Sequence, residues 1–306
     1  MPEQIDIPDG LTSRPLTLAD AGGVVAVMVA QELHDTGVAT IEEADIVADW
    51  QRPSYDVSAS TIGVLDGDRL VAYAEVMGGD RGDAAVHPDH RGRGIGTSLA
   101  RWMQQRAREI GSRVIGMPVP QGSDGDRLLE SLGYAVRWES WELQLPEGAE
   151  IPARALPDGY ALREATPEDH PACWTVLEDA FLEWSDRERL PYNDFLATVV
   201  GRPGFEPWNL RVVTDPAGDI VGVTQIFLAG DEGYVNKVAT RADQRGRGIA
   251  QAMLVDAFAT ARSHGASRSG LSTDSRTGAL RLYEKVGMRV SSTWLNRGIE
   301  LEEQAG

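Results

Sequence analysis

The sequence predicts a mixed-sheet α/β (α+β) protein built from two copies of one domain. The first observation is a repeated motif, because Arg91-Gly92-Arg93-Gly94-Ile95-Gly96 recurs as Arg245-Gly246-Arg247-Gly248-Ile249-Ala250, an offset of 154 residues (91 to 245). The second is that Gly133 and Gly287 keep this offset. The third is that both copies contain the same order of predicted strands and helices. A chain of 306 residues agrees with two domains of ordinary size.

Each copy opens with a strand that leads into a capped helix. Thr17 and Asp20 in the first copy match Thr166 and Asp169 in the second, at an offset of 149 residues (17 to 166). A threonine hydroxyl caps the first free N–H groups of a helix, and an acidic residue three positions later completes the signal. Because this offset is shorter than that of the motif, we expect a modest insertion in the second copy.

A β-hairpin follows in each copy. Segments 61–65 and 69–76 flank an Asp-Gly-Asp turn, and segments 210–214 and 220–227 flank a turn that contains proline and glycine.

The strands that follow, 84–86 and 234–240, each end at a copy of the motif. After each motif, apolar residues recur at spacings of three and four, which predicts a helix with one buried face. These residues are Ile95, Leu99, Met103 and Ile110 in the first copy, and Ile249, Met253, Ala257 and Ala261 in the second.

A fifth strand, a short helix and a terminal strand complete each copy. The fifth strands are 113–117 and 269–273, and the short helices end at Gly133 and Gly287. Residues 146–159 are rich in proline and glycine and lack periodicity, which is typical of a linker. We therefore expect domains at 1–150 and 151–306.

Composition limits the partners of the protein. A formal net charge of −18 disfavours binding to nucleic acid or to an anionic membrane surface, and weakly favours cationic ligands. The N-terminus has no basic or apolar signal region, and no run approaches about 18 apolar residues, so we expect a cytoplasmic protein. Cys173 is the only cysteine, which excludes an intrachain disulfide. We expect no metal and a buried Cys173.

The repeated motif has the chemistry of a phosphate-binding loop. A strand that stops at a glycine-rich turn and becomes a helix presents unpaired N–H groups at the positive end of the helix dipole. Neither copy has the lysine of a Walker loop or the spacing of a dinucleotide-binding fingerprint. We call Arg91–Gly96 the first loop and Arg245–Ala250 the second loop.

The motif Arg-x-x-Gly-x-Gly/Ala after a strand resembles the acyl-CoA pyrophosphate loop of the GNAT N-acetyltransferase superfamily. A second stretch, residues 279–288, resembles the family's other signature, a short helix ending in Leu-Tyr-Glu-x-x-Gly-Phe. The resemblance covers nearly the whole chain, twice. It implies acetyl-CoA as cosubstrate, with its pantetheine between the fourth and fifth strands.

The resemblance also implies positions for the cofactor. The acetyl end would contact Val238, Ala239 and Thr240 of the fourth strand, and the pyrophosphate would meet N–H groups of the second loop. Val86 and the first loop are the matching positions of the N-terminal copy. Family members often carry Asn where this chain has Arg276, and Ser275 is the candidate substitute.

Acetyl transfer needs a proton donor for the departing thiolate, and a tyrosine can serve. Tyr283 occupies the family's general-acid position, four residues before Gly287, whereas Leu129 stands at that position in the first copy. An ordinary core aromatic is the alternative interpretation of Tyr283. Glu232, before the fourth strand, is the candidate general base acting through water, and an exposed turn carboxylate is its alternative. We therefore expect a catalytic C-terminal domain and a degenerate N-terminal one.

Several functions remain open at this level. Acidic residues within 181–195 would receive a cationic amine, although a solvated helix face explains them equally well. Tandem copies with a catalytic second half resemble the mycothiol synthase type, which acetylates a cysteinyl pseudodisaccharide amine. Small-molecule, antibiotic or peptide amines fit as well. A noncatalytic acyl-CoA-binding sensor is the alternative from another class. We expect a monomer or a homodimer.

Overall fold

The computed structural model describes residues 5–185 and 187–302 and divides the chain into two compact units. The N-terminal unit contains the residues before Trp141 together with those from Thr293 onward, and the C-terminal unit is Trp141–Ser292. We predicted continuous domains that meet near residue 150. The division differs because the last strand of the chain pairs with a strand of the N-terminal unit, from Trp294 opposite Pro120 to Glu300 opposite Val114.

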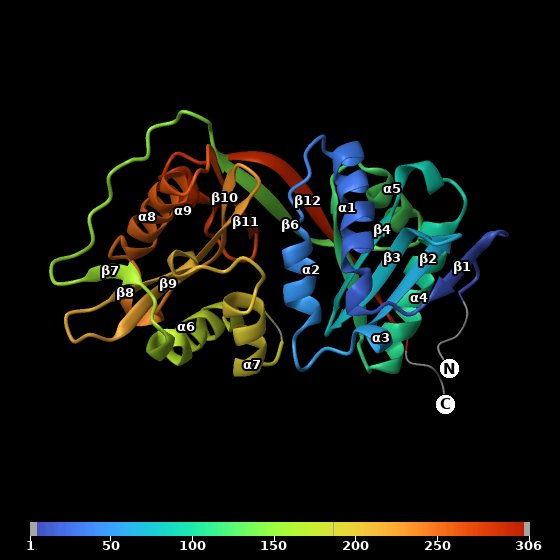
Figure 1. Cartoon of the computed structure of the whole chain (residues 1–306), viewed down its shortest axis with the longest axis horizontal. Coiled ribbons are helices and arrows are strands. Elements are labelled where there is room, and N and C mark those ends of the chain that lie inside the picture. The colour runs from blue at the N-terminus through green and yellow to red at the C-terminus, as the bar shows by residue number, and fades with distance from the viewer. Residues whose placement is uncertain (1–4, 186, 303–306) are drawn as a thin grey trace. The chain divides into compact units, whose positions relative to one another are not determined.

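The N-terminal unit contains a sheet with the strand order β1-β2-β3-β4-β5-β12 (Figure 1). Its strands are β1 (Leu11–Arg14), β2 (Thr61–Asp66), β3 (Arg69–Gly78), β4 (Arg81–Val86), β5 (Val114–Pro120) and the end of β12 (Arg289–Glu300). Its helices are α1 (Ala21–Asp35), α2 (Glu43–Trp50), α3 (Val57–Ser60), α4 (Ile95–Glu109) and α5 (Asp124–Ser131).

The C-terminal unit repeats this plan with the strand order β6-β11-β10-β9-β8-β7. Its strands are the end of β6 (Ala135–Leu145), β7 (Ala161–Glu164), β8 (Leu210–Thr214), β9 (Ile220–Ala229), β10 (Glu232–Thr240) and β11 (Arg268–Asp274). Its helices are α6 (His170–Leu182), α7 (Tyr192–Phe195), α8 (Ile249–Ser263) and α9 (Leu280–Glu284). The predicted mixed α/β fold, with its hairpins and post-motif helices, is confirmed.

The predicted helix start is present in both units. Thr17 and Asp20 form a capping box, and Arg14 binds the Asp20 carboxylate at 2.7 Å. This hydrogen bond from Arg14 lowers the pKa of Asp20 to about 2. Thr166 and Asp169 form the same capping box in the second copy.

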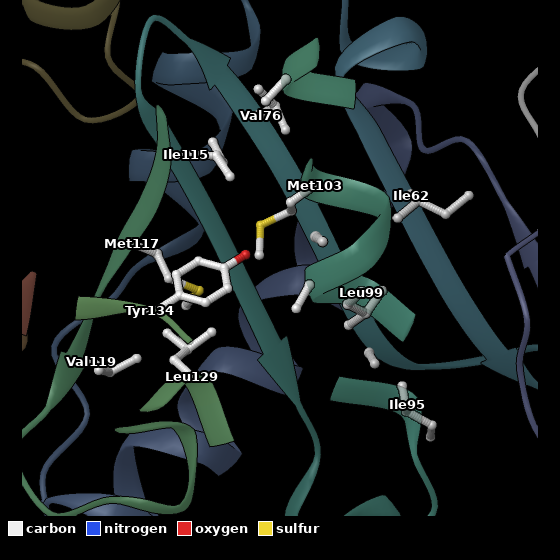
Figure 2. Packing of buried hydrophobic residues seen from close by; sticks show 14 of the residues in the cluster. Ile62, Val76, Ile95, Leu99, Met103, Ile115, Met117, Val119, Leu129 and Tyr134 are labelled. Carbon is white, nitrogen blue, oxygen red and sulfur yellow. The ribbon is translucent and has the colours of Figure 1, made fainter. Parts of the chain in front are cut away.

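Helices cover both faces of the N-terminal sheet. Alternate residues of β3 point to opposite faces, so Tyr73 packs with α1 and α2 whereas Ala72 and Ala74 pack with α4. Figure 2 shows the second of these clusters, in which Met103 of α4 lies above the strands and Leu129 of α5 lies beside Tyr134.

Strand β12 is fixed in the N-terminal unit by a buried arginine. Arg297 donates from Nε to Asp126 at 2.5 Å and from Nη1 to the carbonyl of Tyr134 at 3.0 Å. Arg297 and Asp126 are both buried. The last strand therefore contributes a charge-assisted contact to α5 as well as a row of backbone hydrogen bonds.

Candidate active site

Strands β10 and β11 are paired at their start and unpaired beyond it. They run parallel, but they pair only where residues 232–234 lie opposite residues 268–270. Beyond this point β10 continues to Thr240 and β11 continues to Asp274. Diverging parallel strands leave backbone donors and acceptors on the facing edges without each other as partners. We call the place between these unpaired edges the β10–β11 opening.

Strand β10 contains a bulge, which distinguishes it from the matching strand β4. The pairing of β10 with β9 shifts register between Val235 and Lys237, and the extra residue, Asn236, donates to the Gln225 side chain at 3.0 Å. The N-terminal unit also has a register shift at the matching end of β4, but it falls between Val76 and Gly78, so the extra residue lies on β3. A bulge bends the strand that carries it, so the extra residue redirects β10 in the C-terminal copy and β3 in the N-terminal copy.

The second loop has an open, helix-starting geometry. Gly246 and Gly248 have φ values of +76° and +83°, a backbone region that favours glycine. A side chain at either position would meet nothing within 4 Å. Because α8 begins at Ile249, its first N–H groups face this open space. The arrangement suits a phosphate group.

The edge of β10 reaches the second loop with an unsatisfied hydroxyl. Arg241 donates its N–H to Val221 of β9, so by strand alternation the N–H groups of Thr240 and Val238 point toward the β10–β11 opening. The Thr240 hydroxyl is buried and has no hydrogen-bond partner. Ala239 is buried among residues of α6 and β9. A ligand in the opening would satisfy the donors that β10 presents.

Side chains near the second loop hold its arginines. Arg245 donates to the backbone of Thr240 at 3.1 Å and to the Glu183 carboxylate at 2.5 and 2.7 Å. Arg247 donates to the Tyr160 hydroxyl at 3.3 Å. The Arg245 contacts fix the path from the strand into the helix.

The first loop has the same backbone but a different setting. Gly92 and Gly94 also have positive φ values in open space. Here, however, Arg91 binds Asp124 at 3.2 Å in addition to Asp35 at 2.7 Å. Asp124 begins α5, so it places a carboxylate beside the position that a pyrophosphate would take.

The last backbone N–H group of the strand that leads to the first loop already has a hydrogen-bond partner. The N–H of Val86, which matches Thr240, donates to the Gln31 side chain of α1 at 3.2 Å. The two copies therefore share a loop and differ at the edge where an acyl chain would bind.

Tyr283 lies on α9 with its ring in the core of the C-terminal unit. It is 8% exposed, and burial raises the pKa of its hydroxyl. The ring packs as a core aromatic does, and this place is compatible with both interpretations of the residue. The matching residue, Leu129, is a buried apolar residue of the N-terminal core.

Glu232 is not the exposed turn carboxylate of the alternative interpretation. It is the first residue of β10 and is 4% exposed. Burial raises the pKa of Glu232, and the positive charge of Arg268 opposes this shift. The sequence alone could not exclude the exposed interpretation, because the burial of Glu232 depends on neighbours from β6 and β11 that are distant in sequence.

The candidate acid and the candidate base lie on opposite faces of the sheet. A Cβ at Gly233 would collide with Ala261 of α8, whereas a Cβ at Gly270 would lie 1.8 Å from Glu232 Oε1. Glu232 therefore faces away from α8, and Thr273, three residues after Gly270, faces the core that contains Tyr283. A thioester in the opening would have the carboxylate on one face and the phenol on the other.

Glu232 and the second loop lie at opposite ends of β10. Thr240 lies eight positions after Glu232, a span of roughly 26 Å in an extended strand. The structure thus places the bulge and the opening between the base candidate and the phosphate-binding turn.

The remaining predicted positions surround the end of β11. Ser275 is exposed in the turn that follows this strand. Arg276 donates to Asp274 at 2.6 Å, and its guanidinium lies over the Trp184 ring at 5.0 Å. Glu183, one carboxylate of segment 181–195, binds Arg245, and Asp186 lies outside the described residues.

Sequence reasoning missed Gln31 and Asp124. Gln31 accepts from Val86 across 55 positions of sequence, and Asp124 accepts from Arg91 across 33. Local patterns in the sequence give no signal for either contact.

The described residues contain neither a metal-binding cluster nor a membrane-spanning helix. Residues 5–185 and 187–302 contain no group of three or more His, Cys, Asp or Glu side chains arranged to hold a metal ion. No helix in these ranges is long and apolar enough to cross a membrane. Cys173 is buried, as predicted, and burial raises the pKa of its thiol to about 12.

Comparisons with known proteins agree with this geometry. The model of the acetyltransferase (GNAT) family matches residues 22–134 and 160–288. A mycothiol acetyltransferase of Thermobispora bispora is 28% identical over 288 residues, which cover 89% of this chain and 93% of the relative.

Solved structures share the two-unit fold. A GCN5-related N-acetyltransferase from Sphaerobacter thermophilus superposes with a TM-score of 0.74 at 25% identity, over 97% of this chain and 98% of the other. A tandem GNAT protein from the clavulanic acid biosynthesis pathway gives a TM-score of 0.72 at 17% identity, over 96% and 99% of the two chains, which is a likeness of fold alone.

Proposed function

The chain belongs to the acetyltransferase (GNAT) family, and from this premise we propose that its C-terminal unit transfers an acetyl group from acetyl-CoA to a primary amine by direct attack, with Tyr283 as general acid. The observation that carries the proposal is the difference between the copies. Tyr283 stands where the N-terminal unit has Leu129, and it does so in the unit whose strand β10 is bulged and whose edge is free for an acyl chain.

The residues present fit acetyl-CoA as a substrate. The pyrophosphate would accept hydrogen bonds from N–H groups of the second loop, Arg245–Ala250. The pantetheine and acetyl groups would lie in the β10–β11 opening, where Val238 and Thr240 present N–H groups and the Thr240 hydroxyl lacks a partner. A donor near the thioester oxygen stabilises the charge that develops there during attack.

The reaction balances with one acid and one base. The neutral amine nitrogen attacks the thioester carbon, a C–N bond forms, and the C–S bond breaks as the tetrahedral intermediate collapses. Tyr283 gives its proton to the departing thiolate, and the proton lost by the attacking nitrogen passes through water to Glu232, the candidate base at the far end of β10. Burial favours a protonated Tyr283 at neutral pH because it raises the pKa of the phenol.

In this proposal the N-terminal unit has a structural role and does not bind acyl-CoA. Gln31 occupies the N–H of Val86, and Asp124 adds negative charge beside the first loop. Both features oppose acyl-CoA binding at that copy. The first loop keeps the glycine geometry of a shared ancestor and contributes to the fold of its unit.

The acceptor belongs to the amines, and two observations narrow the choice. The curated relative at 28% identity is a mycothiol acetyltransferase, so a cysteinyl pseudodisaccharide amine is the first acceptor to test. The net charge of −18 favours cationic acceptors over anionic ones.

Thiol release from acetyl-CoA, measured with a panel of amines, tests the proposal. We expect Tyr283→Phe to lose most of the turnover with every accepted amine, and Leu129→Ala to retain it. The reverse result would exclude the C-terminal unit as the site of chemistry. Tight acetyl-CoA binding without thiol release across the whole panel would support the acyl-CoA sensor instead.

A further inference from the structure

The hydroxyl of Tyr160 joins a residue before the second loop to a residue within it. Tyr160 follows the linker directly and precedes β7. Its hydroxyl donates to the Gln244 side chain at 2.6 Å and accepts from Nη1 of Arg247 at 3.3 Å. A phenol has one proton to donate and lone pairs with which to accept, so both contacts can exist together. One side chain from outside the loop therefore restrains an arginine inside it.

Residues 154–160, which we call the strap, fix Tyr160 against the C-terminal unit. The Tyr160 ring packs against the apolar cluster that contains Ile249, the first residue of α8. Arg154, near the other end of the strap, donates to the Gln251 side chain of α8 at 3.2 Å. Figure 1 shows this part of the chain passing α8 before it reaches β7. The hydroxyl is thus brought to the loop by a side chain that packing holds in place.

Arg247 carries a charge that is available to a ligand, in contrast to the arginines beside it. Arg245 is paired with the Glu183 carboxylate at 2.5 and 2.7 Å, and Arg241 is paired with Asp243 at 2.7 Å. Arg247 is exposed and forms no ion pair with a carboxylate of the described residues. The hydroxyl that holds it is neutral, so its positive charge is not cancelled.

A second observation indicates a ligand at this place. The Thr240 hydroxyl, at the end of the strand that leads into the loop, is 8% exposed and has no hydrogen-bond partner among the described residues. A guanidinium presents paired N–H donors that match phosphate oxygens. The net charge of −18 repels an anionic cosubstrate at long range, and an unpaired cation beside the loop opposes that repulsion. An arginine that is already held also loses less side-chain freedom when a phosphate binds.

The N-terminal unit keeps the arginine and lacks the residue that holds it. Arg93 matches Arg247 at the offset of the motif and is exposed. The capping boxes align β1 with β7 at an offset of 149 residues (17 to 166), which places Leu11 at the position of Tyr160. Leu11 packs against the apolar core of its unit and has no polar atom in its side chain. The two loops therefore differ in what restrains their second arginine.

We infer that Tyr160 is a positioning residue for acetyl-CoA: it holds the Arg247 guanidinium beside the second loop, where that group binds a phosphate of the cosubstrate. The inference rests on the proposed function, which places acetyl-CoA at this loop. Tyr160 contacts the arginine and not the cosubstrate. No bond of the cosubstrate changes at its phosphates, so the effect falls on binding and not on the chemical step.

Calorimetric binding of acetyl-CoA and steady-state thiol release test the inference. We expect Arg247→Gln to weaken binding about tenfold and to raise the KM for acetyl-CoA to match, because a hydrogen bond to a charged group is lost. Tyr160→Phe keeps the ring and removes only the hydroxyl, and we expect about threefold weaker binding. The kcat at saturating acetyl-CoA should stay the same in both variants. Unchanged binding in a folded Arg247→Gln or Tyr160→Phe protein would overturn the inference.

Arg93→Gln is the matched control. It removes one exposed arginine from the same position of the first loop and changes the net charge of the chain equally. We expect it to leave acetyl-CoA binding as it is. An equal loss of affinity in this control would show a general effect of net charge and would overturn the inference.

A double-mutant cycle separates positioning from packing. In an Arg247→Gln background, Tyr160→Phe should cause no further loss, since there is no guanidinium to hold. A further threefold loss in that background would assign Tyr160 a role in the fold of the loop alone and overturn the inference.

Acetyl-CoA that lacks the ribose 3′-phosphate identifies the phosphate concerned. If Arg247→Gln weakens the binding of this analogue as well, the partner is the pyrophosphate. If the variant and the wild type bind the analogue equally, the partner is the 3′-phosphate, and both results support the inference. Altered binding in the variants without thiol release from any amine would overturn the proposed transfer alone, whereas normal turnover with unchanged binding in the variants would overturn this inference alone.

Discussion

Gly270→Ala displaces the candidate base without removing it. Gly270 lies on β11 opposite Tyr234, and an added Cβ would lie 1.8 Å from Glu232 Oε1, 2.9 Å from Glu232 Cδ and 3.5 Å from the Tyr234 ring. Only the two distances to the Glu232 carboxyl group are too short. The Gly270 backbone has no positive φ, so alanine is compatible with its conformation.

The distances give the size of the effect. To reach an ordinary contact of 3.4 Å, the Glu232 carboxylate must move by roughly 1.6 Å. A misplacement of about 1 Å in a reacting group can cost a hundredfold in rate, or about 2.7 kcal/mol in the activation free energy. The carboxylate is the end of a flexible side chain, so the free energy of unfolding should change by less than about 1 kcal/mol.

Steady-state thiol release and urea unfolding of Gly270→Ala check both expectations. The control is Gly116→Ala at the matching position of the N-terminal unit, where the new Cβ would lie 2.3 Å from the backbone oxygen of Arg297. Because backbone cannot rotate away, we expect this control to lose about 1–3 kcal/mol of stability. A folded Gly270→Ala protein with an unchanged kcat/KM would refute Glu232 as the base.

Three further predictions follow from other contacts. Arg297→Met leaves Asp126 buried without its cation, and we expect a loss of about 3–5 kcal/mol in urea unfolding; a loss below 1 kcal/mol would contradict this. Burial raises the pKa of Glu75 from its ordinary 4.5 to about 7, so its contribution to stability is complete below pH 4.5 and is lost as the pH rises through 7. Glu75→Gln should therefore flatten the dependence of Tm on pH across this window, and an unaltered slope would count against it. Native mass spectrometry should find one acetyl-CoA per chain, weakened by Gly248→Ala and not by Gly94→Ala, whereas two bound molecules would show a functional first loop.

Much of the fold follows from local patterns in the sequence. The strand that ends at Arg245 and the helix that begins at Ile249 are recognisable because glycine spacing and apolar periodicity act over a few residues. The difference between Tyr283 and Leu129 is equally local, since it needs only the count back from a glycine. These features would be the same whatever the sheet around them.

Other properties depend on partners that are distant along the chain. The sequence predicts terminal strands, but the pairing of β12 with β5 decides that the last strand joins the N-terminal unit. Glu232 is adjacent to a turn in sequence, yet it is buried because Gly270 leaves room for its carboxylate.

The sequence by itself determined that this protein has two copies of one domain plan and that only the second has a tyrosine four residues before its matching glycine. The tertiary structure decided how the two strand edges differ, through the bulge at Asn236 and the contact of Gln31 with Val86. The physical reason is that periodicity and turn chemistry act between neighbours in sequence. Burial, strand register and hydrogen bonding act between neighbours in space.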